Sequence, residues 1–142
     1  MDSQHAQKDM FTKRYRKVRA PQPSENQIQT ALVERFNLMG RKDAVMFHCP
    51  NGGWRFKRSA GVLKAMGVLP GVSDLIFFWP ERNALFLELK AAKRVMTPAQ
   101  EKFAWQMKKC GFAVEWADNL DEALAIPARY GLLTSTLRRA WG

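Results

Sequence analysis

Histidine and cysteine are both scarce in this chain of 142 residues, which contains two of each. Cys49 and Cys110 lie inside or beside apolar runs, so we expect buried reduced thiols or, as the alternative, one disulfide. A zinc site would need more ligands at useful spacing than the chain offers. His5 lies in a basic tail and His48 ends a predicted strand, so neither residue indicates histidine-based catalysis.

Long apolar runs are also missing from the sequence. No stretch is long enough to span a membrane, so we expect no membrane partner. The polar N-terminus has no apolar segment of the kind that signal peptides carry, and we therefore expect a cytoplasmic location, in a bacterial cell or a phage-infected host. Walker and dinucleotide-binding motifs are absent too, so nucleotide-driven chemistry is not indicated.

Acidic residues are few beside the basic ones: 13 Asp and Glu stand against 23 Lys and Arg, for a formal net charge of +10. This excess favours a polyanionic partner, and nucleic acid is the leading candidate. Residues 1–22 hold many of the basic residues, and we expect a flexible arm there. The arm is either a solvated tail or a non-specific contact to phosphates. Residues 23–142 form one domain in this interpretation.

Helical and strand patterns alternate along that domain. Ser24 followed three residues later by Gln27 predicts a helix start, and Gly40 predicts its end. Thr97 and Pro98 predict the start of a second helix, whose inward side chains would be Phe103, Met107 and Cys110. The full predicted order is helix 24–39, strand 44–48, helix 59–66, strands 74–79 and 84–90, helix 97–110, strand 112–116, a short helix ending at 125 before Pro127, and a last helix over 132–141. This order predicts an α/β fold with a mixed central sheet flanked by helices.

Charged residues stand at the ends of two strongly apolar strands. Asp74 opens the first strand, and Glu88 and Lys90 end the second. Side chains alternate along a strand, so Glu88 and Lys90 share one face and Leu89 points to the other. If the strands form a hairpin, Asp74 lies beside this pair. Alone, Glu88 and Lys90 are more often a structural ion pair, but two acids and a lysine on one face are typical of a metal-dependent phosphodiesterase.

Phosphodiester hydrolysis requires an activated water and neutralisation of developing charge. Mg²⁺ or Mn²⁺ held by carboxylates provides both. The candidate ligands are Asp74, Glu88 and the backbone carbonyl of Leu89. Lys90 is the candidate to orient or deprotonate the attacking water, or to hold the phosphate. Its charge therefore has either a catalytic or a structural role.

Two residues on predicted helices extend this candidate site. Glu25 opens the first helix and is either an acid favoured by the helix dipole or a further catalytic and metal-binding carboxylate. Gln100, near the start of the helix over 97–110, is placed to hydrogen-bond the water or a phosphate. The candidate DNA-binding residues are Arg55, Lys57, Arg58, Lys93 and Arg94. The first three follow a glycine-containing loop and alternate with aromatic residues, which suits either nucleic-acid contact or an ordinary loop.

Five short stretches together resemble the VRR-NUC domains of the PD-(D/E)XK nuclease superfamily. They are Pro-Gly-Val-Ser-Asp at 70–74, Leu-Phe-Leu-Glu-Leu-Lys at 85–90, Thr-Pro-Ala-Gln at 97–100, Glu25 with Gln29, and Pro-Asn-Gly-Gly-x-Arg at 50–55. The resemblance covers roughly residues 24–122 and implies a restriction-endonuclease-like fold. Ser73 stands where the superfamily name has proline, a position that shapes the turn and binds no metal.

The resemblance also implies a function. It assigns Asp74, Glu88 and Lys90 to the superfamily's two acids and lysine, Glu25 to its helix acid and Gln100 to its helix glutamine. It implies Mg²⁺- or Mn²⁺-dependent cleavage of DNA, by an endonuclease that resembles stand-alone phage or bacterial proteins acting as dimers on branched DNA.

Two other functions remain open from the sequence. A DNA-binding module without catalysis would use the same basic residues and keep the acids as structural charges. An RNA-directed enzyme would use the same chemistry on another substrate. A homodimer is expected in the nuclease interpretation, because a junction has two strands to cut and twofold pairing presents two sites.

Overall fold

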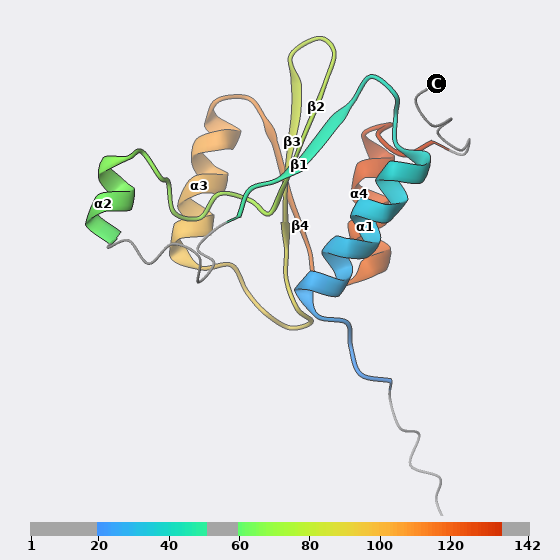
Figure 1. Cartoon of the computed structure of the whole chain (residues 1–142), viewed down its shortest axis with the longest axis horizontal. Helices are drawn as coiled ribbons and strands as arrows, with labels where there is room; N and C mark the ends of the chain where they lie inside the picture. Colours follow the sequence, from blue (N-terminus) through green and yellow to red (C-terminus); the bar gives the residue numbers. More distant parts are fainter. Residues whose placement is uncertain (1–19, 51–59, 135–142) are drawn as a thin grey trace, which may run out of the picture.

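The chain folds into a mixed four-stranded sheet with helices on both faces, as the computed structural model shows for residues 20–50 and 60–134 (Figure 1). The elements are α1 (Glu25–Met39), β1 (Val45–His48), α2 (Ala60–Ala65), β2 (Leu75–Trp79), β3 (Asn83–Leu89), α3 (Pro98–Lys109), β4 (Ala113–Ala117) and α4 (Leu120–Arg129). The predicted α/β class and the order of these elements are confirmed. No helix of the described ranges is long and apolar enough to cross a membrane.

The sheet has the strand order β1-β2-β3-β4. Strand β2 runs antiparallel to both β1 and β3, whereas β4 runs parallel to β3. The expected hairpin of β2 and β3 is present, with Leu75 opposite Leu87. Inner strand β3 is buried from Ala84 to Leu89, as its apolar sequence predicts. The charged end of β3 therefore lies within a covered sheet.

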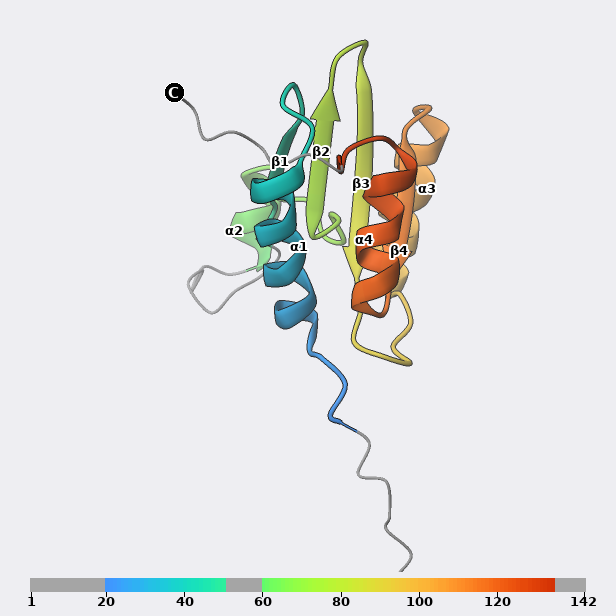
Figure 2. The same cartoon turned by 90° about the vertical axis from the view of Figure 1, so that its right-hand side faces the viewer.

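Two layers of helices cover this sheet. Helices α1 and α4 lie on one face, and α3 lies on the other (Figure 2). The α1–α4 side holds the larger core, in which Phe36 packs edge-on against Phe77 with ring centroids 5.6 Å apart. On the α3 side Phe86 packs against Phe103, also at 5.6 Å. The alternation predicted for β3 is confirmed, because Leu85, Leu87 and Leu89 join the first core and Phe86 the second.

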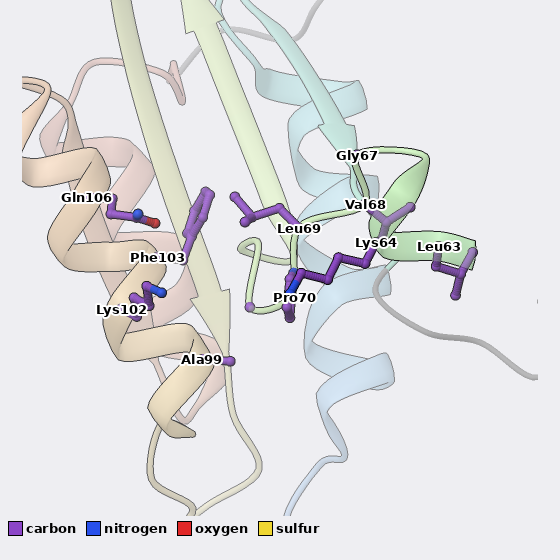
Figure 3. A pocket seen from close by; sticks show the side chains of 11 residues that line it. Leu63, Lys64, Gly67, Val68, Leu69, Pro70, Ala99, Lys102, Phe103 and Gln106 are labelled. Atoms are coloured by element: carbon purple, nitrogen blue, oxygen red, sulfur yellow. The ribbon is translucent and has the colours of Figure 1, made fainter. Parts of the chain in front are cut away.

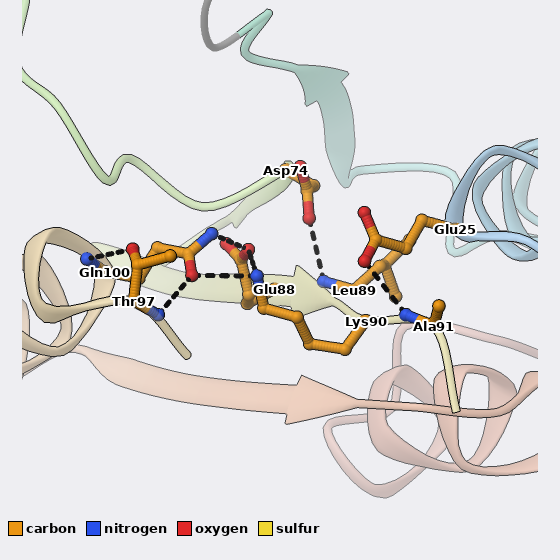
Figure 4. A network of polar contacts seen from close by, with 8 residues as sticks. All are labelled: Glu25, Asp74, Glu88, Leu89, Lys90, Ala91, Thr97 and Gln100. Atoms are coloured by element: carbon orange, nitrogen blue, oxygen red, sulfur yellow. Dashed lines mark hydrogen bonds and ion pairs between the residues drawn. The ribbon is translucent and has the colours of Figure 1, made fainter. Parts of the chain in front are cut away.

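The predicted starts of α1 and α3 both form capping boxes. Ser24 accepts from the Gln27 amide while the Gln27 side chain accepts from the Ser24 amide, and Thr97 and Gln100 repeat this reciprocal pair. Each cap fixes the first turn of its helix. These turns carry Glu25 in α1 and Gln100 in α3, and both side chains lie at the charged end of β3 (Figure 4).

Three expectations from the sequence are corrected by the structure. Cys110 is exposed rather than inward, because it is the C-cap of α3, and both cysteines are free thiols. Helix α4 continues through Pro127 to Arg129 instead of ending before it. The proline ring is fully buried, which offsets the loss of one hydrogen bond near the end of the helix. Leu133 forms a bridge with Gly40 instead of starting a helix, and residues 135–141 lie outside the described part.

A close contact joins the chain before β2 to the start of α3. Gly71 has a φ of +81°, and a Cβ atom placed there would overlap the carbonyl of Ala99 and lie 2.7 Å from the Gln100 nitrogen. A cavity of about 830 Å³ opens beside this contact, between α2, residues 67–71 and α3 (Figure 3). Only glycine allows the two segments to approach so closely.

This contact can be tested with a matched pair of glycine substitutions. Gly67 has a similar φ of +84° but open space around the Cβ position. Gly67→Ala should therefore lower the free energy of unfolding by about 1 kcal/mol, from the left-handed conformation alone. Gly71→Ala should cost roughly 1–3 kcal/mol more, because α3 must move. Urea denaturation measures both values, and equal losses would contradict the close contact.

Candidate active site

The charged end of β3 is organised around one glutamine side chain. The Nε2 group of Gln100 donates to Oε1 of Glu88 in a short hydrogen bond. The Oε1 atom of Gln100 accepts from Lys90 Nζ at 2.8 Å (Figure 4). Lys90 Nζ also lies 3.1 Å from Glu88 Oε1. Glu88 is 2% exposed and Lys90 is 7% exposed. The acid, the lysine and the amide thus form one buried polar cluster.

The two other candidate acids bind the backbone of the same segment. Asp74 Oδ2 accepts from the Leu89 amide at 2.8 Å, and Glu25 Oε1 accepts from the Ala91 amide at 2.9 Å. The Lys90 amide between them donates instead to the Ala117 carbonyl of β4, at 2.8 Å. Asp74 and Glu25 therefore bind the backbone amides at and just after the end of β3, on the side where no residue of β2 pairs with them. Each contact involves one carboxylate oxygen and does not use the other.

Electrostatics couples these carboxylates to each other. Burial, together with the neighbouring charges of Asp74 and Glu25, raises the pKa of Glu88 from 4.5 to about 7, against the lowering effect of Lys90. Burial also raises the pKa of Asp74, against the lowering effect of the Leu89 amide and Lys90. Asp74 and Glu88 thus share a region where burial disfavours their ionised forms, and added positive charge would offset that effect.

The donor chemistry of this region fits a hard divalent cation. Carboxylate and carbonyl oxygens are the ligands that Mg²⁺ and Mn²⁺ prefer, and a cation would relieve the repulsion that raises the pKa of Glu88. The acids are arranged around the Leu89 backbone and do not converge on a point. In residues 20–50 and 60–134, no three His, Cys, Asp or Glu side chains are grouped closely enough to hold a metal ion. The assignment of Asp74, Glu88, Glu25 and the Leu89 carbonyl as ligands stays a prediction.

Two contacts of this site were not predicted from the sequence. Gln100, expected to reach a water or phosphate, is bonded to Glu88 and Lys90 and also caps α3 through Thr97. His48, set aside in the sequence, has its Nδ1 atom 2.7 Å from the backbone carbonyl of Asp74. The antiparallel pairing of His48 with Leu75 explains this contact, because it places the imidazole beside Asp74, the residue before β2.

The candidate DNA-binding residues fall into two groups. Lys93 and Arg94 are exposed and follow the charged end of β3 closely, at positions where they are accessible to phosphates. Arg55, Lys57 and Arg58 lie outside the described residues, as does the basic arm up to residue 19. The assignment of all five side chains to DNA contact stays a prediction.

Comparison with known proteins gives a consistent result. A family model of the VRR-NUC domain matches residues 13–119 of the chain. A solved structure described as a VRR_NUC domain protein is similar at a TM-score of 0.64, with 23% identity, covering 78% of this chain and 89% of that one. Another solved structure, described as a VRR_NUC domain, has a TM-score of 0.52 and 16% identity, and the match covers 76% of this chain and 99% of that one. These two likenesses show the fold. No curated protein matches the chain significantly.

The raised pKa of Glu88 predicts how stability of the metal-free protein changes with pH. Between pH 4.5 and about 7 the folded state binds a proton that the unfolded chain has released. The stability that the protonated Glu88 side chain contributes is fully present below pH 4.5 and is lost as the pH rises to about 7. In EDTA, urea denaturation should show wild type losing more stability across this window than Glu88→Gln. Glu101→Gln, at an exposed position of α3, is the control, and parallel profiles for wild type and Glu88→Gln would contradict the burial of an ionisable carboxyl.

Proposed function

The chain belongs to the VRR-NUC domain family of the PD-(D/E)XK nuclease superfamily, and from that membership we propose that it is a divalent-metal-dependent endonuclease acting on branched DNA. The family makes it a nuclease-type DNA-processing domain with DNA as substrate. The finer proposal is supported above all by one observation: a buried lysine, held by Glu88 and Gln100, lies beside Asp74 at the end of β3. A non-catalytic DNA-binding module would not require this arrangement.

A bound cation would supply charge neutralisation and water activation at the phosphodiester. Mg²⁺ or Mn²⁺ would be held by Asp74, Glu88 and the Leu89 carbonyl, with Glu25 contributing directly or through water. The Leu89 and Ala91 amides restrict how Asp74 and Glu25 can turn, because each carboxylate is bonded to a fixed backbone group. The acids are thus oriented before any substrate arrives, which reduces reorganisation in the reaction.

Lys90 is the group proposed to act on the reacting atoms. Its ammonium is almost fully buried and is held at 2.8 Å by Gln100 and at 3.1 Å by Glu88. This pair of contacts limits the lysine to a small region next to the acids, where it orients the attacking water or contacts a phosphate oxygen. Gln100 positions both residues and needs no contact with substrate for that role.

The exposed residues around this cluster are proposed to bind the DNA backbone. Lys93 and Arg94 lie shortly after the cluster in the chain, and their positively charged side chains are exposed at the surface. Contacts to phosphates fix the position of DNA without reading its sequence. A homodimer would present two such clusters to the two strands of a junction. A panel of junction, flap, duplex and single-stranded substrates, in DNA and RNA, tests the substrate class.

Replacing Lys90 tests the catalytic assignment. Lys90→Met keeps an apolar stem in the buried site but removes the ammonium, so kcat should fall by roughly 10²–10⁴. DNA affinity in EDTA should change by less than about threefold, because the cluster is not a surface phosphate contact. Lys108→Ala, at an exposed lysine near the other end of α3, should retain cleavage. Wild-type rates in Lys90→Met would remove Lys90 from the mechanism.

Metal removal separates the nuclease from a binding module. EDTA should abolish cleavage of branched DNA, and Mg²⁺ or Mn²⁺ should restore it, because the acids supply only negative charge to the phosphodiester. Salt-dependent DNA binding should persist in EDTA. A chain that binds DNA but cleaves no substrate with either metal would be a binding module.

A further inference from the structure

The cavity beside the Gly71–Ala99 contact is not part of the catalytic cluster. Its volume of about 830 Å³ falls within the usual range of small-molecule pockets, roughly 300–1,000 Å³. One wall is formed by residues 63–71, from α2 and the segment that leads to β2, and the other by α3. Leu69 and Phe103 lie on opposite walls (Figure 3). We refer to it as the α2–α3 cavity.

The charges at the α2–α3 cavity are of one sign. Lys64 on α2 and Lys102 on α3 line it, and no acidic residue does among those that the structure describes. Neither lysine is in an ion pair within the described part of the chain. Apolar walls with two available cations suit a ligand that has an apolar body and a negative charge. A nucleotide has both, in its base and its phosphate.

The charge of the protein argues against its own segments as the occupant. A second copy of this chain would bring a net charge of +10 to the two lysines. The basic residues 1–22 would meet the same repulsion. DNA, the substrate of the nuclease family, has the opposite charge.

The α2–α3 cavity adjoins the catalytic cluster through the backbone. Ala99 lines the cavity and precedes Gln100, whose side chain is bonded to Glu88 and Lys90. Gly71 lines it three residues before Asp74. DNA whose phosphodiester lies at the cluster therefore has its neighbouring nucleotides near the cavity. A base that is paired and stacked cannot enter a pocket, so the occupant must be unpaired or extruded.

We propose that the α2–α3 cavity binds the base and sugar of an unpaired nucleotide next to the cleaved phosphodiester, with Lys64 and Lys102 contacting its phosphates. This inference rests on the proposed nuclease function and extends it, because it assigns the recognition of branched DNA to a defined pocket. Leu69 and Phe103 would contact the base, and Gln106, also in the lining, would offer it a hydrogen bond. The chain would then select substrates with an unpaired nucleotide at one position relative to the cut.

Fluorescence of 2-aminopurine tests this proposal in the full chain. The probe base is placed in turn at each position of the single strand of a flap and at each position next to the branch point of a junction, and emission is measured on binding in EDTA, where no cleavage is expected. Wild type should change the emission at one or two adjacent positions. Leu69→Asp places a negative charge in the cavity and should remove that change and weaken binding roughly ten-fold, the usual scale for loss of one base contact.

Two controls make the test specific. Leu38→Asp, at a leucine 57% exposed on α1, matches Leu69, which is 47% exposed, and should leave emission and affinity unchanged. An abasic site at the responsive position should weaken wild-type binding by the same factor as Leu69→Asp and should not weaken that variant further. Circular dichroism checks that both variants are folded.

The possible results separate the pocket from the proposed activity. Absence of a position-specific signal, or equal effects of Leu69→Asp and Leu38→Asp, would overturn the pocket. So would a change from dimer to monomer in Leu69→Asp during sedimentation with emission unaltered, because a second copy would then occupy the cavity. A position-specific signal that Leu69→Asp removes would support the pocket even if wild type cleaved nothing, a result that would refute only the endonuclease.

Discussion

The side-chain amide of Gln100 is the contact on which the arrangement of the candidate active site depends. Its oxygen accepts from the Thr97 amide and from Lys90, while its nitrogen donates to Glu88. One residue therefore closes the first turn of α3 and also fixes an acid and a lysine on β3. The start of α3 and the geometry of the site consequently depend on the same side chain. A shift of α3 would therefore displace the contacts of Glu88 and Lys90.

A second constraint comes from the unequal lengths of the strands. Strand β2 begins opposite Leu87, so the next amides of β3 on that side have no strand partner. Carboxylates of Asp74 and Glu25 accept from these amides in its place. Buried backbone groups need partners, and here the partners are the acids of the candidate site. The requirement for backbone hydrogen bonding thus contributes directly to the arrangement of the candidate catalytic groups.

Local patterns in the sequence were sufficient for most of the fold. The capping residues Ser24 and Thr97 and the alternation in β3 predicted element types and faces correctly, because each signal acts within a few residues. The continuation of α4 through Pro127 was missed, since burial of the ring depends on α4 packing in the core. The contacts of Gln100 with Glu88 and Lys90 were also beyond local reasoning. Spacing placed these side chains near one another, but the choice of hydrogen-bond partners depends on how α3 docks.

The contact between Glu25 and the Ala91 amide joins residues 66 positions apart. Glu88 and Lys90 likewise depend on α3 and β4, which are synthesised after them. A nascent chain that has reached Lys90 therefore contains the acids and the lysine but lacks both elements that hold them. Assembly of the cluster requires nearly the whole domain, so incomplete translation products and proteolytic fragments would carry the signature residues without the arrangement of the candidate active site.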